Sequence, residues 1–194
     1  MTIPLIYKDI GMTNQDTFGL GDINIEPVIL SWHKPTYDLS FGLSLYLPTG
    51  DYEAGDLSSP GMDMYTFMTT FGATYYFDNA KEWTASILSR YEIHSEKGDS
   101  DITRGDDFHF EWGVGKTVAK VWDIGLAGYC QWQLTNDSGT GSTNNKDQVY
   151  AIGPEVSMFY PPGMFALSLR ALAEFEAEDR PEGSVISLVF TKVF

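Results

Sequence analysis

The sequence predicts an all-β protein, an antiparallel up-and-down transmembrane β-barrel. Apolar and polar residues alternate with a period of two through most of the chain, so each predicted strand has one apolar and one polar face. The connections between these runs are short and long in turn, and aromatic residues stand at the ends of the apolar faces. These features are typical of a barrel with short turns at one rim and long loops at the other.

Composition limits the alternatives. The chain has 194 residues, which suits a single domain over residues 1–194. It carries 27 acidic and 12 basic residues, and this charge balance argues against a nucleic-acid partner, because phosphate contacts need clustered Lys and Arg. One cysteine, Cys130, excludes an internal disulfide and a cysteine-rich metal site. No apolar run approaches the roughly 18 residues of a transmembrane helix, and we expect no signal peptide at the N-terminus.

About ten runs alternate, and no segment has the periodicity of a helix. In the clearest run, Leu39, Phe41 and Leu43 share one face, and Ser40 and Ser44 share the other. In chain order the runs are residues 3–10, 22–32, 38–48, 64–77, 83–93, 108–115, 122–134, 150–160, 165–176 and 185–194. Pro27 interrupts the second run, and we expect a β-bulge there because proline cannot donate to a ladder. Residues 1–16 are expected to form a partial strand or a tail.

The connections fall into two classes. The short ones are residues 33–36, 78–81, 119–120 and 160–163. The long ones are residues 49–63, 95–106 and 136–147, which are polar and rich in Gly, Asp, Ser and Asn. Since short and long connections take turns, each class is expected at its own end of the barrel.

An alternating barrel can be soluble, with its apolar faces inward, or embedded in a membrane, with its apolar faces toward lipid. Three features favour the membrane. Runs of about ten residues match the ~9–11 residues of a tilted spanning strand. Aromatic residues such as Trp122 and Trp132 mark both ends of one apolar face, as two membrane interfaces favour. The apolar faces carry almost no charge. A charged side chain facing lipid at the bilayer midplane would cost about 2–4 kcal/mol. A soluble ligand-binding barrel is the alternative.

The C-terminus resembles the β-signal by which outer-membrane proteins are recognised for assembly. The residues that carry this signal are Phe194, Phe190, Leu188 and Ile186, which share one strand face. Lys192 departs from the usual hydrophobic residue in that row, and its side chain can snorkel to the interface. An ordinary terminal strand that ends in Phe is the alternative.

Six motifs in order resemble the outer-membrane channel family associated with the meta-pathway of phenol degradation. They are residues 19–23 (GLGDI, followed by Pro27 and Trp32), 47–52 (LPTGDY), 100–107 (SDITRGDD), 128–139 (GYCQWQLTNDSG), 151–154 (AIGP) and 180–183 (RPEG). The resemblance covers nearly the whole chain from about residue 17 onward.

The resemblance implies a monomeric barrel of twelve antiparallel strands in the outer membrane of Gram-negative bacteria. Its expected partners are outer-membrane lipid, lipopolysaccharide, the barrel assembly machinery and a small-molecule solute. Because only about ten strands are visible here, the resemblance also implies an N-terminus shortened by about one hairpin and the signal peptide. Closure of the barrel is therefore an open question at this point.

The polar faces supply candidate lumen residues, among which acids outnumber bases. They are Arg90, Glu92, His94, His109, Glu111, Gln131, Gln133, Glu155, Arg170, Glu174 and Glu176, together with Asp22, Asn24 and Glu26 of the second run. An acidic pore wall favours cations over anions. The leading hypothesis is passive diffusion of small solutes through a narrow acid-lined lumen. The resemblance suggests small aromatic or hydrophobic compounds.

Two alternatives concern the same residues. The arginines could pair with Glu92, Glu111 or Glu174 and fill the interior as a structural network, since buried charges are normally paired. The barrel would then be a closed structural protein. An outer-membrane hydrolase would need a Ser/His or Asp/His pair, for which His94 near Asp99 or Asp101 is the candidate. We expect no enzymatic activity.

We also expect no cofactor and no transition-metal site, because His33, His94 and His109 lack a ligand spacing in sequence. The acidic long loops could hold divalent cations that bridge lipopolysaccharide, or they could simply be solvated.

Overall fold

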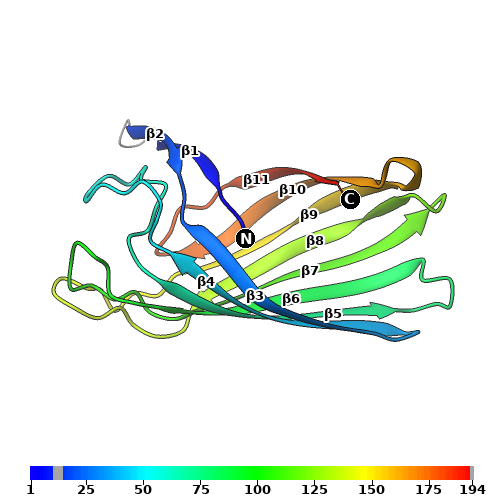
Figure 1. Ribbon diagram of the computed structural model, residues 1–194, viewed down its shortest axis with the longest axis horizontal. Coiled ribbons are helices and arrows are strands. Elements are labelled where there is room, and N and C mark those ends of the chain that lie inside the picture. The colour runs from blue at the N-terminus through cyan, green and yellow to red at the C-terminus, as the bar shows by residue number, and fades with distance from the viewer. Residues whose placement is uncertain (11–14, 193–194) are drawn as a thin grey trace.

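The computed structural model describes residues 1–10 and 15–192, and it confirms an all-β antiparallel fold for them. Each strand of the larger sheet pairs with its neighbours in sequence (Figure 1). The strands are β1 (Leu5–Ile10), β2 (Gln15–Leu20), β3 (Ile23–His33), β4 (Tyr37–Leu47), β5 (Thr66–Tyr76), β6 (Trp83–His94), β7 (Asp107–Val118), β8 (Trp122–Gln133), β9 (Gln148–Tyr160), β10 (Phe165–Glu178) and β11 (Ser184–Lys192). One turn of 3-10 helix, η1 (Pro161–Gly163), joins β9 to β10. Among the described residues no helix is long and apolar enough to cross a membrane.

The N-terminal segment pairs with the chain that follows it. β1 and β2 form a separate two-stranded sheet, and β2 is a strand that the sequence analysis does not predict. β2 leads into β3 through Gly21 and Asp22 alone. Thr2 and Asn24 exchange two backbone hydrogen bonds of 2.8 and 3.1 Å. The chain before β1 therefore continues the antiparallel pairing from β2 onto the start of β3.

Two sequence-based expectations about local structure are confirmed. The register between β3 and β4 shifts between Ile25 and Val28, which places a bulge at Pro27. The loops at residues 48–65, 95–106 and 134–147 gather at one end of the sheet, and the short turns of residues 34–36, 77–82, 119–121 and 161–164 lie at the other (Figure 1). The two ends of the fold are therefore chemically different.

The apolar faces of the strands point outward. In β5, Phe67, Phe71 and Tyr75 are 42%, 47% and 51% exposed, whereas the side chains that alternate with them, such as Thr66 and Met68, are buried. Most buried polar residues of the strands likewise lie on the inner face. This arrangement contradicts the soluble alternative, in which the apolar faces would fill the interior, and it matches the polarity of a barrel in lipid.

Aromatic rings contact one another in two groups at opposite ends of the strands. Near the long loops, a chain of rings crosses four strands: centroid distances are 6.1 Å for Phe108–Trp132, 5.7 Å for Trp132–Tyr150 and 5.8 Å for Tyr150–Phe175. Near the short turns, Phe165 contacts the rings of Tyr160 and Phe190, and Tyr75 contacts Phe77. Two such belts are what the two interfaces of a membrane favour.

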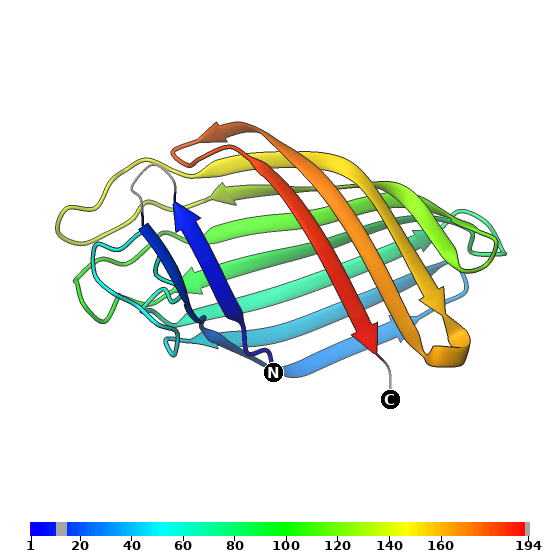
Figure 2. The ribbon, with the colours of Figure 1, turned by 90° about the horizontal axis from the view of Figure 1, so that it is seen from above.

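The sheet is curled but not closed. β3 and β11 are its two edges, and in the described part of the chain they do not pair with each other. Figure 2 shows the sheet strongly curved, with β11 and the β1–β2 hairpin on the near side. Because neighbouring strands alternate in direction, β3 and β11 run the same way, and a strand between them would be antiparallel to both. The expected closed barrel is thus present as an open, strongly curved sheet.

Asp22 ties the junction of β2 and β3 to the loop of residues 48–65. Its Oδ1 accepts hydrogen bonds from the backbone N–H groups of Thr49 (3.1 Å) and Gly50 (2.9 Å), and its Oδ2 accepts one from Met62 (2.9 Å). The sequence analysis places Asp22 in the lumen, but in the structure its carboxylate is committed to this loop.

The same loop holds the β1–β2 hairpin. Lys8 Nζ donates to the Ser59 carbonyl oxygen at 2.6 Å, and the Leu20 N–H donates to Asp51 Oδ2 at 2.8 Å. The hairpin is therefore anchored from both of its strands at the end of the fold that carries the long loops.

We expect Asp22→Ala to release the loop of residues 48–65, because three N–H groups lose a charged acceptor worth about 1.5–3 kcal/mol per hydrogen bond. Limited proteolysis of the folded protein in detergent should cut this loop at least ~10-fold faster, the change that ~1.4 kcal/mol produces in an opening equilibrium. Glu53→Ala, at an exposed position of the same loop, is the control. Equal cleavage of the two variants would contradict this role of Asp22.

Candidate functional site

The concave face of the sheet carries the polar side chains of β6 to β10. The registers place Arg90 opposite His109, Glu92 opposite Asp107, and Arg170 opposite Glu155. Because side chains two residues apart in a strand share a face, these cross-strand pairs form one continuous polar surface.

Four of these side chains form a salt-bridged group, which we call the arginine–glutamate belt. Arg90 Nη1 donates to Glu111 Oε1 at 2.8 Å, and Arg170 Nη1 donates to Glu111 Oε2 at 2.9 Å. Arg170 also contacts Glu155 Oε2 through Nε at 3.0 Å and Nη2 at 2.9 Å. Since Glu111 lies on β7 and Arg170 on β10, the belt reaches across the hollow over the two strands between them.

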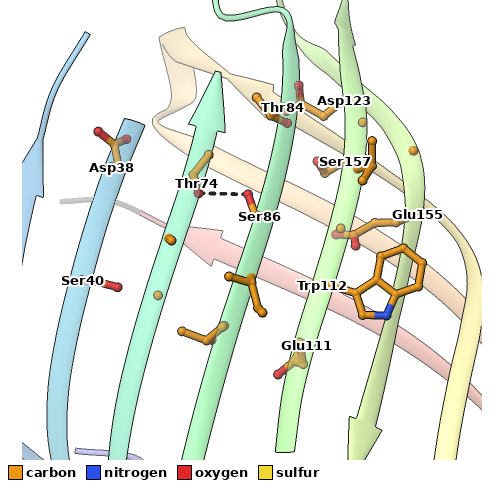
Figure 3. Close-up of a pocket in the computed structure, with 18 of the residues that line it drawn as sticks. Asp38, Ser40, Thr74, Thr84, Ser86, Glu111, Trp112, Asp123, Glu155 and Ser157 are labelled. Atoms are coloured by element: carbon orange, nitrogen blue, oxygen red, sulfur yellow. Dashed lines mark hydrogen bonds between the residues drawn. The ribbon is translucent and has the colours of Figure 1, made fainter. Parts of the chain in front are cut away.

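Two cavities lie along the concave face, one toward each end of the belt. The first has a volume of about 600 Å³ and extends toward the short turns, with Glu111 and Arg170 among its lining residues (Figure 3). The second has a volume of about 570 Å³ and is lined in part by Arg90, Glu92 and His109. Both volumes lie in the range of pockets that hold small molecules.

A second network lies closer to the long loops. The Tyr129 hydroxyl donates to the Glu174 carboxylate, which also accepts the Gly183 N–H at 2.8 Å. Arg180 Nη1 donates to Gln131 Oε1 at 3.0 Å, and its Nη2 lies 3.8 Å from Glu174 Oε1. Glu174 and Gln131 are therefore engaged with the connection between β10 and β11.

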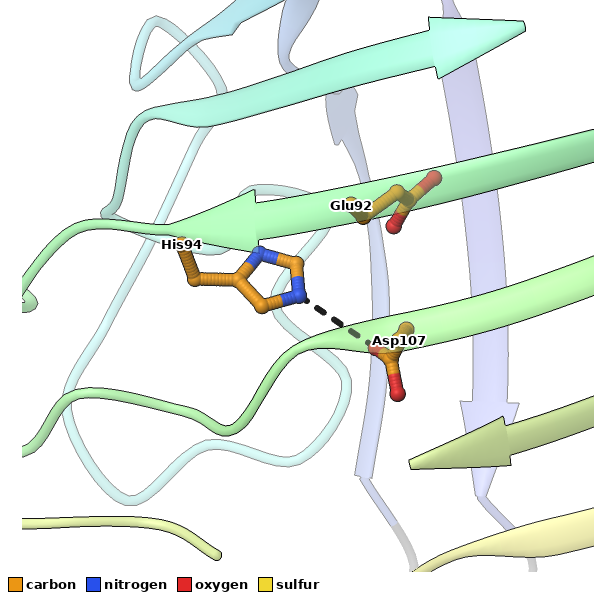
Figure 4. Close-up of side chains that lie close together, drawn as sticks. All are labelled: Glu92, His94 and Asp107. Carbon is orange, nitrogen blue, oxygen red and sulfur yellow. Dashed lines mark hydrogen bonds and ion pairs between the residues drawn. The ribbon is translucent and has the colours of Figure 1, made fainter. Parts of the chain in front are cut away.

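A third group is buried where β6 ends and β7 begins. His94 and Asp107 are 8% and 3% exposed. His94 Nδ1 lies 2.8 Å from Thr66 Oγ1, and its Nε2 lies 3.3 Å from Asp107 Oδ2 (Figure 4). Glu92 precedes His94 by two residues on the same face and stands directly opposite Asp107.

Arginine and histidine flank these carboxylates. Arg104 Nη2 lies 3.1 Å from Asp107 Oδ2 and 3.1 Å from Asp147 Oδ2, and His109 Nε2 lies 3.3 Å from Glu92 Oε1. Burial raises the pKa of Asp147 above its ordinary value, although the charge of Arg104 acts in the opposite direction. The loop residues Arg104 and Asp147 thus close this group from the side of the long loops.

The structure brings nine of the predicted lumen residues into these networks, places Asn24 and Glu26 in the lining of the second cavity, and places Asp22, Gln133 and Glu176 elsewhere. Those in the networks are Arg90, Glu92, His94, His109, Glu111, Gln131, Glu155, Arg170 and Glu174. Gln133 is buried at the end of β8, where its amide donates to the Thr135 carbonyl (3.0 Å) and to Asp137 (2.7 Å). Glu176 is exposed, with φ of 52°, beside a register shift between β9 and β10.

Four charged residues of the networks, Asp107, Arg104, Asp147 and Arg180, were outside the predicted lumen set. Asp107 lies one residue before the predicted run of residues 108–115, and alternation carried two residues back from His109 would have found it. Arg104 and Arg180 lie in connections between strands. There, alternation does not show in which direction a side chain points. Their participation depends on how the loops fold back over the sheet.

The candidate hydrolase pair is wrong, because His94 contacts neither of the aspartates considered for it. Asp99 accepts a hydrogen bond from the Tyr52 hydroxyl at 3.1 Å, and Asp101 accepts one from Thr140 Oγ1 at 2.7 Å. The bonds from Thr140 lower the pKa of Asp101. Both aspartates therefore serve contacts within and between loops.

The residues of the expected assembly signal lie on the outer face of β11 where the structure describes them. Ile186, Leu188 and Phe190 are 79%, 67% and 65% exposed, while Phe194 lies outside the described residues. Lys192 Nζ donates to the Gly163 carbonyl at the short-turn end.

The belt predicts an energetic coupling between Arg90 and Glu111. Their side chains are 23% and 36% exposed, so we expect a coupling of about 1 kcal/mol, at the upper end of values for exposed pairs. A double-mutant cycle with Arg90→Ala and Glu111→Ala, followed by urea unfolding in detergent, measures it. The pair Arg90 and Glu176 is the control, with no expected coupling. Additive effects at Arg90 and Glu111 would show that the contact contributes nothing.

Comparisons with known proteins agree with this architecture. The sequence model of the family described as "Putative MetA-pathway of phenol degradation" matches residues 2–190. No curated protein gives a significant match. Among solved structures, an outer membrane channel from Pseudomonas putida F1 has a similar fold, with a TM-score of 0.75 and 13% sequence identity. The similarity covers 90% of this chain and 66% of the channel chain, so this chain spans slightly less than two thirds of the channel's length. Because the family model matches almost the entire sequence, this chain belongs to the phenol-degradation MetA-pathway family.

Proposed function

We propose that this chain forms a channel in the bacterial outer membrane through which small solutes diffuse passively. The observation that carries this proposal is the polarity of the curled sheet, with apolar side chains outward and charged side chains around two cavities. Contact with lipid requires the outward apolar side chains, and a water-filled path requires the charged side chains on the inside. The shared fold with an outer membrane channel supports the proposal.

The lumen that we propose is selective for cations. The first cavity is lined by four carboxylates, Asp38, Glu111, Asp123 and Glu155, and by one arginine. The second is lined by two carboxylates and one arginine. A wall with excess negative charge raises the local concentration of cations and lowers that of anions.

Small aromatic or hydrophobic compounds are the solutes that we propose beyond simple ions. The family description, which refers to phenol degradation, supports this class. The first cavity also combines the apolar side chain of Leu88 with hydroxyls, among them Thr74 and Ser86, which lie 2.9 Å apart (Figure 3). Such a mixed lining suits a flat ring that carries a polar substituent.

A structural barrel with a blocked lumen is the second candidate, and the arginine–glutamate belt favours it. The belt joins β7 to β10 across the hollow, so it narrows any path between the two cavities. A hydrolase has less support. Thr66 and His94 are 7% and 8% exposed, which leaves little room for a substrate carbonyl beside the hydroxyl.

Reversal potential in a salt gradient across a planar bilayer tests the channel proposal. We expect discrete conductance steps and a potential of the sign that cation selectivity gives. A folded protein that inserts without conducting would favour the closed barrel, and anion selectivity would contradict the acid-lined path.

Glu111→Gln should lower the cation-to-anion permeability ratio by roughly twofold or more, because it removes the carboxylate that faces both arginines of the belt. Glu82→Gln, an exposed position in a short turn, has the same change in charge and should leave the ratio unchanged. A ratio that responds equally to both substitutions would locate the selectivity in the overall charge of the protein.

A further inference from the structure

Two carboxylates face each other at the long-loop ends of β6 and β7. Glu92 and Asp107 are directly opposite in the register and lie on the same concave face. Like charges in this position destabilise a sheet unless a positive charge lies between or beside them. The Asp107 side chain is 4% exposed, so water cannot screen the repulsion.

His94 completes the group and adds a nitrogen donor. Its side chain is 3% exposed, and Thr66 Oγ1 lies 2.8 Å from Nδ1. When Nδ1–H donates to that hydroxyl, the lone pair of Nε2 faces Asp107 Oδ2 across 3.3 Å. In this tautomer a nitrogen lone pair and a carboxylate oxygen face each other and favour a cation between them, whereas in the other tautomer Thr66 Oγ1 donates to Nδ1 and Nε2–H donates to Oδ2.

The hydrogen bonds of Asp107 are incomplete. Its Oδ1 is buried and has no hydrogen-bond partner among the described residues. An orphaned buried oxygen of a charged group costs at least about 1–3 kcal/mol. Arg104 contacts Oδ2 at 3.1 Å but shares its charge with Asp147. Arg104 thus serves two carboxylates, and it does not contact Glu92, the third carboxylate of the group.

We propose that Glu92, His94 and Asp107 bind one divalent transition-metal ion, with Zn²⁺ as the representative. One donor atom from each residue lies within 4.8 Å of the other two (Figure 4). Donors at about 2.1 Å from a tetrahedral Zn²⁺ are roughly 3.4 Å apart, close to the spacing of His94 Nε2 and Asp107 Oδ2. The flexible Glu92 side chain closes the remaining distance.

The donor set and its surroundings fit this class of ion. An imidazole nitrogen with two carboxylates suits Zn²⁺, Mn²⁺ or Fe²⁺, whereas Ca²⁺ and Mg²⁺ prefer oxygen alone. The charge of a divalent ion would offset the facing carboxylates of Glu92 and Asp107. Thr66 orients His94, as outer partners of metal ligands commonly do.

The position of the site gives the ion a structural role. The loop of residues 95–106 leaves β6 directly after His94 and enters β7 directly before Asp107. A bound ion would thus join both ends of this loop at the mouth of the hollow. The site does not depend on the proposed channel function, since a folded protein can bind the ion whether or not it conducts.

Titration of metal-free folded protein in detergent with Zn²⁺, followed by calorimetry, tests the proposal. We expect one Zn²⁺ per chain with micromolar or tighter affinity, and a rise in the temperature at which the sheet unfolds. Co²⁺ should give visible absorption bands of a low-symmetry site with a nitrogen ligand. His94→Gln and Asp107→Asn should each weaken binding by at least ~10-fold.

The matched control is His33→Gln, because His33 Nδ1 lies 3.1 Å from Asp38 in an exposed pair at the opposite end of the sheet. It should leave Zn²⁺ affinity unchanged. Absence of stoichiometric binding, or binding that survives His94→Gln, would overturn the proposal. If a variant fails to fold, displacement of Co²⁺ bands by Zn²⁺ in the unmodified protein decides, and absence of such bands counts against the site.

Discussion

The constraint on which this structure depends is that lipid offers no partner for a polar group. Each strand must present an apolar face outward, and its charges are therefore confined to the concave face. The exposed Phe67 and Phe71 beside the buried Thr66 show this division within one strand. The same constraint crowds acidic and basic side chains together on the concave face. An arrangement there is stable only when its charges are paired.

The concave face resolves that crowding in two ways. In the middle of the sheet, Glu111 is shared by two arginines and the charges balance. Near the long loops, carboxylates are in excess. There, Oδ1 of Asp107, beside His94, has no hydrogen-bond partner among the described residues. The balanced region narrows the path between the cavities, and the unbalanced region attracts cations. The selective passage and the bound metal ion that we propose would thus be separate consequences of one distribution of charge.

The fold could be predicted from the sequence because a period of two identifies both the strands and their faces. The position of Pro27 also predicted the β-bulge between Ile25 and Val28. β2 was missed because residues 15–20 form a short run that Gly21 separates from β3. The site was predicted less completely. Alternation shows which face holds Arg170, but its contact with Glu111, three strands away, depends on the curvature of the sheet. The contact between His94 and Asp107 depends on the register of β6 against β7, which cannot be read from the sequence of the long loop between them.

Accessibility along β5 tests the central claim, which is the outward apolar face, most directly. Single cysteines at residues 66–76, introduced with Cys130→Ser, can carry a nitroxide in the membrane-reconstituted protein. The account predicts that collisions with oxygen, which partitions into lipid, peak at the odd-numbered positions from Phe67 to Tyr75, and that collisions with a water-soluble nickel reagent peak at the even-numbered positions from Thr66 to Tyr76. The reverse phase, or no alternation, would contradict it.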